Sequence, residues 1–284
     1  MIKKNSRIIV YIVKLFMHIH EFLHSVFNIN IKGVSFFYKF LNYEDYFRFG
    51  NKFLFYNPKV RGSYARLING KYNETETHIF LRHILNTFSN MNFTLVEVGG
   101  NVGEFLIDFG GDNQIDKFYI FEPQIECVLS LNKTVEKNNF KNVLIVPKAA
   151  YDTNGFVSFK KTESFSGSHI DTNGNSDLKV ETVTIDTINI NQKNIIMLID
   201  AEGAELKIMK GARNLIQREI PLIIFEYNYV TKQYFEIENV YEELGRDYKI
   251  FRLSKNGILD EKLREKNWNL VAININGLFK RLSE

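Results

Sequence analysis

The chain has 284 residues, of which 45% are hydrophobic and 24% are charged, which excludes a disordered protein and allows a sizeable core. Its formal net charge of +3 is too small to indicate nucleic-acid binding. A single cysteine, Cys127, excludes an intrachain disulfide and favours a reducing compartment, and no Cys-x-x-Cys or histidine cluster indicates a zinc site.

The segment from residue 8 to residue 27 has the spacing of an amphipathic helix. Intervals of four and three residues place six apolar side chains on one stripe: Ile8, Ile12, Leu15, Ile19, Phe22 and Val26. Lys14 and Glu21 interrupt the segment, which argues against a membrane-spanning helix and against a secretory signal. We expect a cytoplasmic protein. The basic N-terminus favours peripheral contact of residues 1–27 with the inner face of the membrane, or a homodimer contact, and packing on the protein's own domain is the alternative.

Residues 35–85 suggest a boundary between an N-terminal extension and a main domain. Residues 35–60 are rich in aromatic side chains, and we interpret them as helix and loop around Pro58. A second helix is predicted over residues 74–85, where acids occupy the first turn. We therefore assign residues 1–73 to a helical N-terminal extension and residues 74–284 to the main domain. We expect the extension to cap the site where an acceptor substrate binds, to join two subunits or to contact a membrane surface.

From Thr94 onward, strands and helices alternate, beginning with a strand over residues 95–98 and a glycine turn. The turn contains Gly99, Gly100, Asn101 and Gly103. Glycines allow positive φ and close approach to a ligand, and the helix that follows, residues 102–109, presents free N–H groups. Glu97 precedes the first glycine by two residues, where it would repel the pyrophosphate of a dinucleotide but suits a ligand with an ammonium group. A plain strand-to-helix turn is the alternative.

A second strand is predicted over residues 117–121 and ends at Glu122-Pro123. An acid at this strand end, about twenty residues after the glycine turn, can accept hydrogen bonds from both hydroxyls of a ribose. A helix over residues 124–138 and a strand over residues 143–146 complete a βαβαβ unit.

Residues 151–194 change to a period of two, which predicts a β insertion. Two short strands, at residues 156–159 and 180–185, flank a polar loop that contains Ser166, Gly167, Ser168 and His169. This loop is a candidate lid or acceptor loop, and a solvated loop is the alternative.

The last part of the chain contributes four further strands. They cover residues 195–199, 222–225, 248–253 and 270–275, with helices predicted over residues 203–218 and 236–244. Asp200 and Glu202 follow the first of these strands, and Glu226 follows the second. Together with Glu97 and Glu122, they concentrate acids at the carboxyl edge of a parallel sheet, where such folds bind ligands.

Each acid also has a structural interpretation. Glu97 could bind neighbouring loop N–H groups, Asp200 or Glu202 could cap the following helix, and Glu226 could pair with an arginine.

Several strings, in this order, resemble the FkbM family of S-adenosylmethionine-dependent methyltransferases. They are Val96-Glu97-Val98-Gly99-Gly100-Asn101-Val102-Gly103, Phe121-Glu122-Pro123, Ser166-Gly167-Ser168, Ile199-Asp200-Ala201-Glu202-Gly203-Ala204-Glu205 and Lys210-Gly211-Ala212. The similarity runs over residues 74–228, and Gly100 stands where the family more often has alanine. It implies an α/β fold of the class I methyltransferase (Rossmann-like) type, with a seven-stranded, mostly parallel sheet, one antiparallel edge strand and helices on both faces.

The resemblance also implies a function, O-methylation of a carbohydrate, glycoconjugate or natural-product acceptor with S-adenosylmethionine as the cofactor. We assign to the cofactor site Glu97, Gly99, Gly100, Asn101, Gly103, Glu122, Pro123 and Ala150. Asp200, Glu202 and His169 are the candidates for removing the proton of the acceptor hydroxyl.

The residues themselves leave three alternatives to this function open. Asp200 and Glu202 could instead hold a divalent cation that orients vicinal hydroxyls, although the sequence identifies no third ligand. A protein that binds the cofactor without catalysis is the alternative function. A nicotinamide-dependent oxidoreductase is disfavoured because the G-x-G-x-x-G pattern is missing.

Overall fold

The computed structural model describes residues 44–162, 167–171, 176, 178–263 and 269–283, together with Leu15, Phe16, Ile19, Phe22 and Leu23. The other members of the predicted N-terminal stripe and Ser166 of the polar loop lie outside the described residues. Among the helices that the structure describes, none combines the length and the apolar character needed to cross a bilayer.

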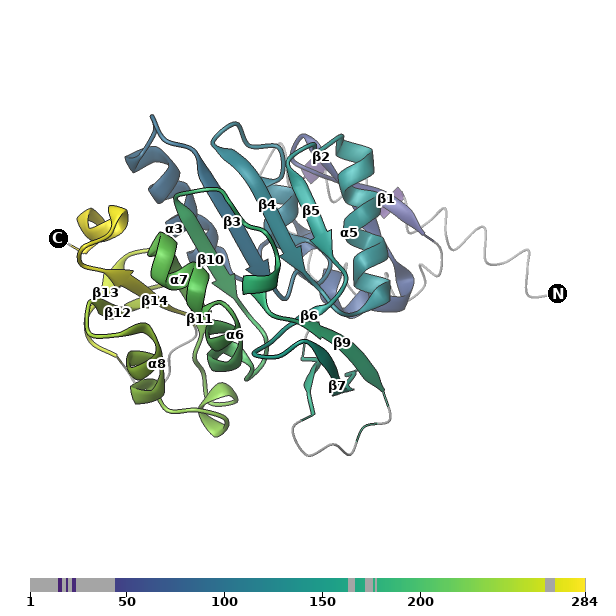
Figure 1. Ribbon diagram of the computed structural model, residues 1–284. Helices are drawn as coiled ribbons and strands as arrows, with labels where there is room; N and C mark the ends of the chain where they lie inside the picture. Colours follow the sequence, from purple (N-terminus) through teal and green to yellow (C-terminus); the bar gives the residue numbers. More distant parts are fainter. Residues whose placement is uncertain are drawn as a thin grey trace.

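An eight-stranded sheet forms the centre of the protein (Figure 1). In spatial order its strands are β13 (Leu259–Asp260), β12 (Tyr248–Leu253), β14 (Asn269–Asn274), β11 (Leu222–Glu226), β10 (Ile195–Ile199), β3 (Phe93–Val98), β4 (Ile115–Phe121) and β5 (Val143–Val146). The five strands from β11 to β5 are parallel, so their carboxyl ends meet at one edge. That edge is where an open α/β sheet places its ligands.

Each of the seven predicted strands is present, and two details differ from the expectation. The reversed strand, β14, is not at the edge, because it pairs with β11 on one side and β12 on the other. Its first five residues are all buried, as an interior strand requires. The short strand β13 pairs with β12 and adds an eighth member at that edge.

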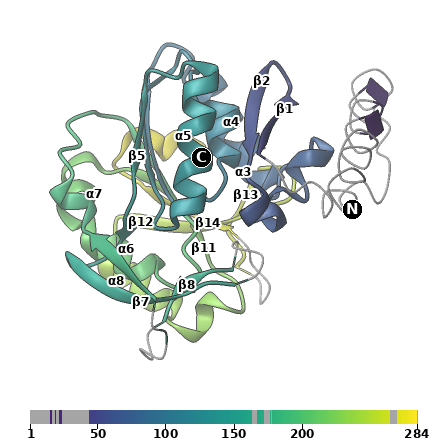
Figure 2. The ribbon, with the colours of Figure 1, turned by 90° about the vertical axis from the view of Figure 1, so that its right-hand side faces the viewer.

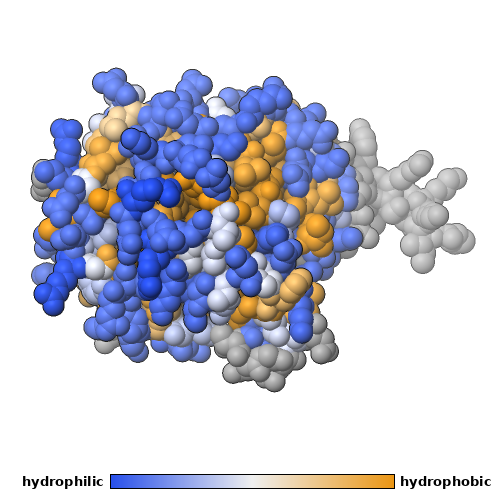
Figure 3. Space-filling model, viewed as in Figure 1, coloured by the Kyte–Doolittle hydropathy of each residue, from blue (hydrophilic) through white to orange (hydrophobic). Residues whose placement is uncertain are grey.

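Helices cover both faces of the sheet, as expected. Apolar side chains of α3 (Thr75–Thr87), α4 (Glu104–Phe109) and α5 (Ile125–Asn138) pack on one face. Those of α6 (Glu205–Gly211), α7 (Arg213–Glu219) and α8 (Ile237–Leu244) pack on the other. No described α-helix connects β5 to β10, and Figure 3 shows apolar side chains in the centre of the face where β4 and β5 lie. Leu144 of β5, for example, is 43% exposed.

The part of the extension that we expected to be helix and loop is instead a β-hairpin. Its strands, β1 (Asp45–Phe49) and β2 (Lys52–Tyr56), pair in register across the two-residue turn Gly50-Asn51. Glycine-containing two-residue turns between alternating strands are a hairpin signal, and the aromatic content concealed this alternation. Two short 3₁₀ helices follow, η2 (Pro58–Tyr64) and η3 (Leu67–Asn69).

The hairpin packs on α5 and α4, as Figures 1 and 2 show. The Phe55 backbone N–H donates to Thr134 Oγ1 at 3.1 Å, and the Asn138 side chain bonds both backbone groups of Phe53. One continuous core, which we call the extension core, joins the two parts. It consists of Phe47, Leu54, Tyr56, Val60, Tyr64, Leu67 and Ile68 from the extension with Val102, Ile107 and Cys127 from the main domain.

Between β5 and β10 the chain forms a second, small sheet. It contains β6 (Ala149–Ala150), β9 (Lys179–Val183), β7 (Gly155–Lys160) and β8 (His169–Ile170), in this spatial order. Figures 1 and 2 place this sheet beyond the carboxyl edge of the large one. The remaining short helices are η4 (Ile185–Thr187), η5 (Thr231–Gln233) and η6 (Leu278–Leu282).

Candidate functional site

A cavity of about 720 Å³ opens at the carboxyl edge of the parallel strands. This volume lies within the usual range for small-molecule sites. The glycine turn lines it through Gly99, Gly100 and Asn101, and the extension contributes Ser63, Arg66 and Asn73. Eight acids of the main domain also line it: Glu74, Glu76, Glu97, Glu104, Glu122, Asp200, Glu202 and Glu226. The cavity therefore favours a ligand that carries positive charge.

The glycine turn is held by the protein itself. The N–H groups of Gly99 and Gly100 donate to the carbonyl oxygen of Phe121 at 3.0 and 3.3 Å. Gly99 has φ +94°, and a Cβ added there would lie 1.9 Å from the carbonyl oxygen of Asp200. Gly99 is thus required by the neighbouring strand β10, in addition to any ligand. Gly103 begins α4 and is not among the residues that line the cavity.

Glu122 anchors the loop after the glycine turn. Its Oε2 accepts the N–H of Asn101 at 2.8 Å, and its Oε1 accepts the N–H of Gln124 at 2.8 Å. Burial raises the pKa of Glu122 to about 7, and the two backbone N–H groups oppose this rise. The carboxylate is 2% exposed, so only its cavity side can meet a ligand.

Glu97 has the opposite character. Its side chain is 4% exposed, and its Oε2 is buried without a hydrogen-bond partner among the described residues. Burial, followed by the charges of Glu104 and Glu122, raises the pKa of Glu97 to about 8. Glu97 therefore does not bind neighbouring loop N–H groups, the structural interpretation left open by the sequence. A buried oxygen that lacks a partner is costly unless a ligand satisfies it.

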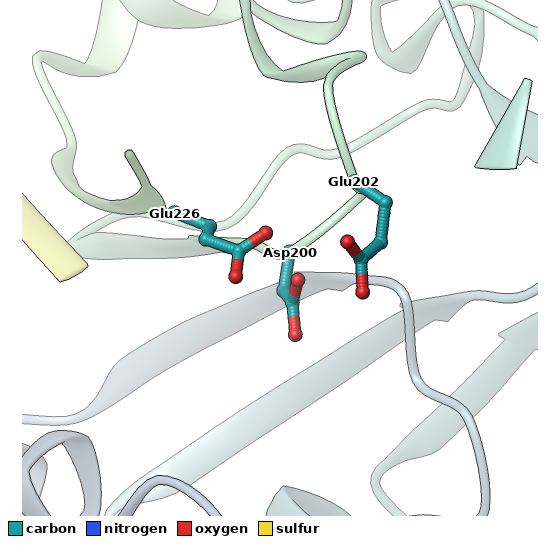
Figure 4. A group of neighbouring side chains, drawn as sticks. All are labelled: Asp200, Glu202 and Glu226. Atoms are coloured by element: carbon teal, nitrogen blue, oxygen red, sulfur yellow. The ribbon is translucent and has the colours of Figure 1, made fainter. Parts of the chain in front are cut away.

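Asp200, Glu202 and Glu226 form one group, which we call the acid cluster (Figure 4). One carboxylate oxygen from each lies within 4.8 Å of the others. Asp200 and Glu226 meet because β10 and β11 are adjacent and Ile199 pairs with Phe225. Glu202 sits in the turn after β10 with φ +51°, a conformation that non-glycine residues adopt only when the surroundings hold them there.

The structural alternatives for the acid cluster are taken by other residues. Glu205 caps the turn before α6, because its carboxylate accepts the N–H groups of Ala201 and Gly203. Glu226 pairs with no arginine among the described ion pairs, and its Oε1 accepts from Asn228 Nδ2 at 2.5 Å. The three carboxylates are therefore not used by helix capping or ion pairing.

The acid cluster holds its protons more tightly than free carboxyl groups do. Burial raises the pKa of Asp200, and a hydrogen bond shared with Glu226 opposes this rise. Burial and then the charge of Asp200 raise the pKa of Glu202 to about 7 and also raise that of Glu226. The side chain of Asp200 is exposed to the cavity on one side and enclosed by protein on its other sides. This enclosure explains why the pKa of Asp200 is raised although the residue is exposed.

Besides Gly103, three predicted site residues are not brought to the cavity. His169 lies on β8, where its Nδ1 is 3.1 Å from the carbonyl oxygen of Gly167. Ala150 is 2% exposed within the core on β6, and Pro123 follows β4. None of the three is among the residues that line the cavity, whereas Ser168 of the polar loop is.

Other lining residues were missed from the sequence. Glu74, at the start of α3, is half-buried and receives hydrogen bonds from Asn269 and Thr77. The cavity is also lined by Arg252, near the end of β12, and by Lys255, just after that strand. Their position at a strand end was the available signal. Glu74 could not be found because its partner Asn269 lies 195 residues away in the chain.

Comparison with protein families agrees with this geometry. A model of the methyltransferase FkbM domain matches residues 88–249, more than half of the chain. The chain belongs to the FkbM methyltransferase family. The residues that match the FkbM domain include the glycine turn, Glu122 and the acid cluster, but neither Glu74 nor Arg252.

Solved structures similar to this FkbM methyltransferase are distant in sequence. Methyltransferase FkbM from Methylobacillus flagellatus KT has 17% identity and a TM-score of 0.44, over 65% of this chain and 45% of that chain. The chain thus spans less than half of that protein's length. M. jannaschii TYW2 in complex with AdoMet has 12% identity and a TM-score of 0.41, over 81% and 84%. An rRNA methylase from Streptococcus thermophilus has 9% identity and a TM-score of 0.41, over 70% and 96%. Among curated proteins, none matches the chain.

Proposed function

We propose that this FkbM methyltransferase is an S-adenosylmethionine-dependent O-methyltransferase that acts on a carbohydrate, glycoconjugate or natural-product hydroxyl. The observation that carries the proposal is the acidic cavity at the carboxyl edge, where the unpartnered oxygen of Glu97 faces a pocket of suitable size. S-adenosylmethionine carries an ammonium group and a sulfonium, so its charge matches this lining.

The cofactor is proposed to lie along the glycine turn. Its ammonium group would satisfy Glu97, and its ribose hydroxyls would donate to Glu122, whose two oxygens each have a further lone pair beside the N–H bonds already made. When bound, the cofactor supplies the methyl group. The sulfur–carbon bond then lies toward the acid cluster.

The reaction needs alignment and the removal of one proton. The acceptor oxygen attacks the methyl carbon, the sulfur–carbon bond breaks, S-adenosylhomocysteine leaves, and the hydroxyl proton passes to a carboxylate. Alignment of the three atoms can supply a large part of the rate. Asp200 and Glu202 are the proposed proton acceptors, because both line the cavity and are not used by capping or ion pairing.

Replacement of Glu122 tests the cofactor site. We expect Glu122→Gln to weaken the binding of S-adenosylmethionine by at least tenfold, because a hydrogen bond to a charged group contributes about 1.5–3 kcal/mol. Calorimetric titration with S-adenosylmethionine and S-adenosylhomocysteine measures the affinity. Glu136→Gln on α5 is the matched control, since Glu136 has a 76% exposed side chain far from the lining residues. Unchanged affinity in a folded Glu122→Gln protein would contradict the ribose assignment.

The titration does not separate the enzyme from the alternative, a protein that binds the cofactor without using it, because both bind the cofactor. A screen of sugar nucleotides and surface glycans with methyl-labelled cofactor would give label transfer only for the enzyme. Binding without transfer to any acceptor in the screen would favour the binding protein.

Contact of the N-terminal segment with a membrane or a second subunit remains a separate proposal. Three members of the predicted stripe, Leu15, Ile19 and Phe22, are 52%, 44% and 59% exposed. Peripheral binding should increase with anionic lipid and decrease with salt. Vesicle flotation measures it, with Leu15→Glu as the weakened variant. Absence of flotation, together with a monomer in light scattering, would leave packing on the protein's own domain.

A further inference from the structure

The acid cluster brings three carboxyl groups together without a basic partner among the described residues. Its three carboxylates converge from the end of β10, the turn after it and the end of β11 (Figure 4). No ion pair among the described residues joins any of them to a basic side chain, and Arg252, in the same cavity, pairs with Asp260. The cofactor has a net charge of +1 and would be held at the other end of the cavity.

A second observation points to a cation at this place. Among the described residues, the buried Oε2 of Glu97 has no hydrogen-bond partner, and that of Glu226 accepts from no N–H or O–H donor apart from the proton that Glu226 shares with Asp200. Glu97 pairs in register with Leu198, and Leu198 pairs with Ile224. Because alternate residues of a strand share a face, Glu97, Asp200 and Glu226 project from the same face of the sheet. Glu97, which is 4% exposed, thus adds a nearly enclosed carboxylate to the same cavity.

We propose that Asp200, Glu202 and Glu226 form a divalent-cation site. Three carboxylate oxygens are ligands for a hard cation, and the open cavity side leaves positions for water or for vicinal hydroxyls of an acceptor. A carboxylate that holds the ion is not free to take the acceptor's proton, so the ion site is the alternative to the use of Asp200 and Glu202 as proton acceptors. The role in orienting the acceptor rests on the proposed function, but ion binding itself does not.

The donor set favours Ca²⁺. Mg²⁺ usually takes one or two carboxylates and keeps several of its waters, whereas Ca²⁺ accepts a larger set of oxygen ligands in flexible geometry. The acid cluster offers three carboxylates, with one oxygen of each within 4.8 Å of the others. We therefore expect Ca²⁺ to bind more tightly than Mg²⁺.

Calorimetric titration of the full-length protein with CaCl₂ tests the site. We expect one Ca²⁺ per chain, weaker binding of Mg²⁺, and at least tenfold weaker Ca²⁺ binding by Glu226→Gln and by Asp200→Asn. Glu136→Gln, the matched control outside the cavity, should bind Ca²⁺ like the wild type. Circular dichroism establishes that each variant is folded.

Two outcomes would overturn the proposal. One is the absence of saturable binding of Ca²⁺, Mg²⁺ or Mn²⁺ at millimolar concentration by the folded wild-type protein. The other is equal Ca²⁺ affinity in the wild type and both cluster variants. The titration needs neither cofactor nor acceptor, so a failure of methyl transfer and a failure of ion binding are separate results.

Discussion

Replacing Asp200 by asparagine is expected to lower the rate of methyl transfer by ~100- to 10,000-fold, the usual contribution of a placed proton acceptor. The affinity for S-adenosylmethionine should change little, because the carboxylate is used mainly in the transition state. Asp200 follows β10, next to the glycine turn, and its side chain lines the cavity. Single-turnover transfer of labelled methyl to the acceptor identified by the glycan screen measures the rate.

Glu202→Gln is the companion variant, because it also keeps the size of the side chain and removes its charge. Burial and the charge of Asp200 raise the pKa of Glu202 to about 7. A carboxylate accepts a proton only above its pKa, so turnover that depends on Glu202 should fall as the pH decreases through 7. If both variants keep wild-type turnover across the pH range, neither carboxylate is the base. Alignment without a base would then explain the reaction, since His169 does not line the cavity.

The second large effect is on stability. Gly99→Ala is expected to reduce the free energy of unfolding by about 2–5 kcal/mol, the sum of about 1–2 kcal/mol for a left-handed backbone and about 1–3 kcal/mol for overpacking. Gly99 has φ +94°, and the new Cβ would lie 1.9 Å from the carbonyl oxygen of Asp200. Chemical denaturation gives the free energy, provided that the transition is two-state.

Gly245 provides a matched control for the backbone part of this effect. It has φ +89°, and a Cβ added there would meet nothing within 4 Å. Gly245→Ala should therefore cost only the backbone contribution, about 1–3 kcal/mol for a conformation (φ 89°, ψ 168°) that essentially only glycine adopts. Equal losses for the two variants would show that the contact with Asp200 is unimportant. A larger loss for Gly99→Ala would mean that the protein's own packing requires glycine at this position, in addition to any requirement of a ligand.

The local elements were predictable because each has a local signal. The buried runs that became β3, β4 and β10 lie between clear turn residues, and their lengths exclude helices. The order of strands in space has no such signal. Periodicity places β14 as a strand, but only pairing with both β11 and β12 puts it inside the sheet. The hairpin of β1 and β2 was missed although it carries two local signals, aromatic residues that favour strands and the two-residue turn Gly50-Asn51.

The candidate site shows the same division. Glu122 and Asp200 could be named because each ends a predicted strand. The third member of the acid cluster could not be assigned a role, since Glu226 meets Asp200 only through the adjacency of β10 and β11. The polar loop was interpreted from its composition alone, which does not determine that Ser168 lines the cavity while His169 does not.

The extension core also determines where the chain can be shortened. Val102, Ile107 and Cys127 of the main domain are covered by Phe47, Leu54 and Tyr64 of the extension. A chain cut at residue 74, the boundary that the sequence suggests, would leave these three side chains facing water beside the glycine turn. Newly exposed apolar surface of this kind promotes aggregation. Recombinant work on the main domain should therefore retain the hairpin, because the hairpin belongs to the smallest part of the chain that we expect to remain soluble.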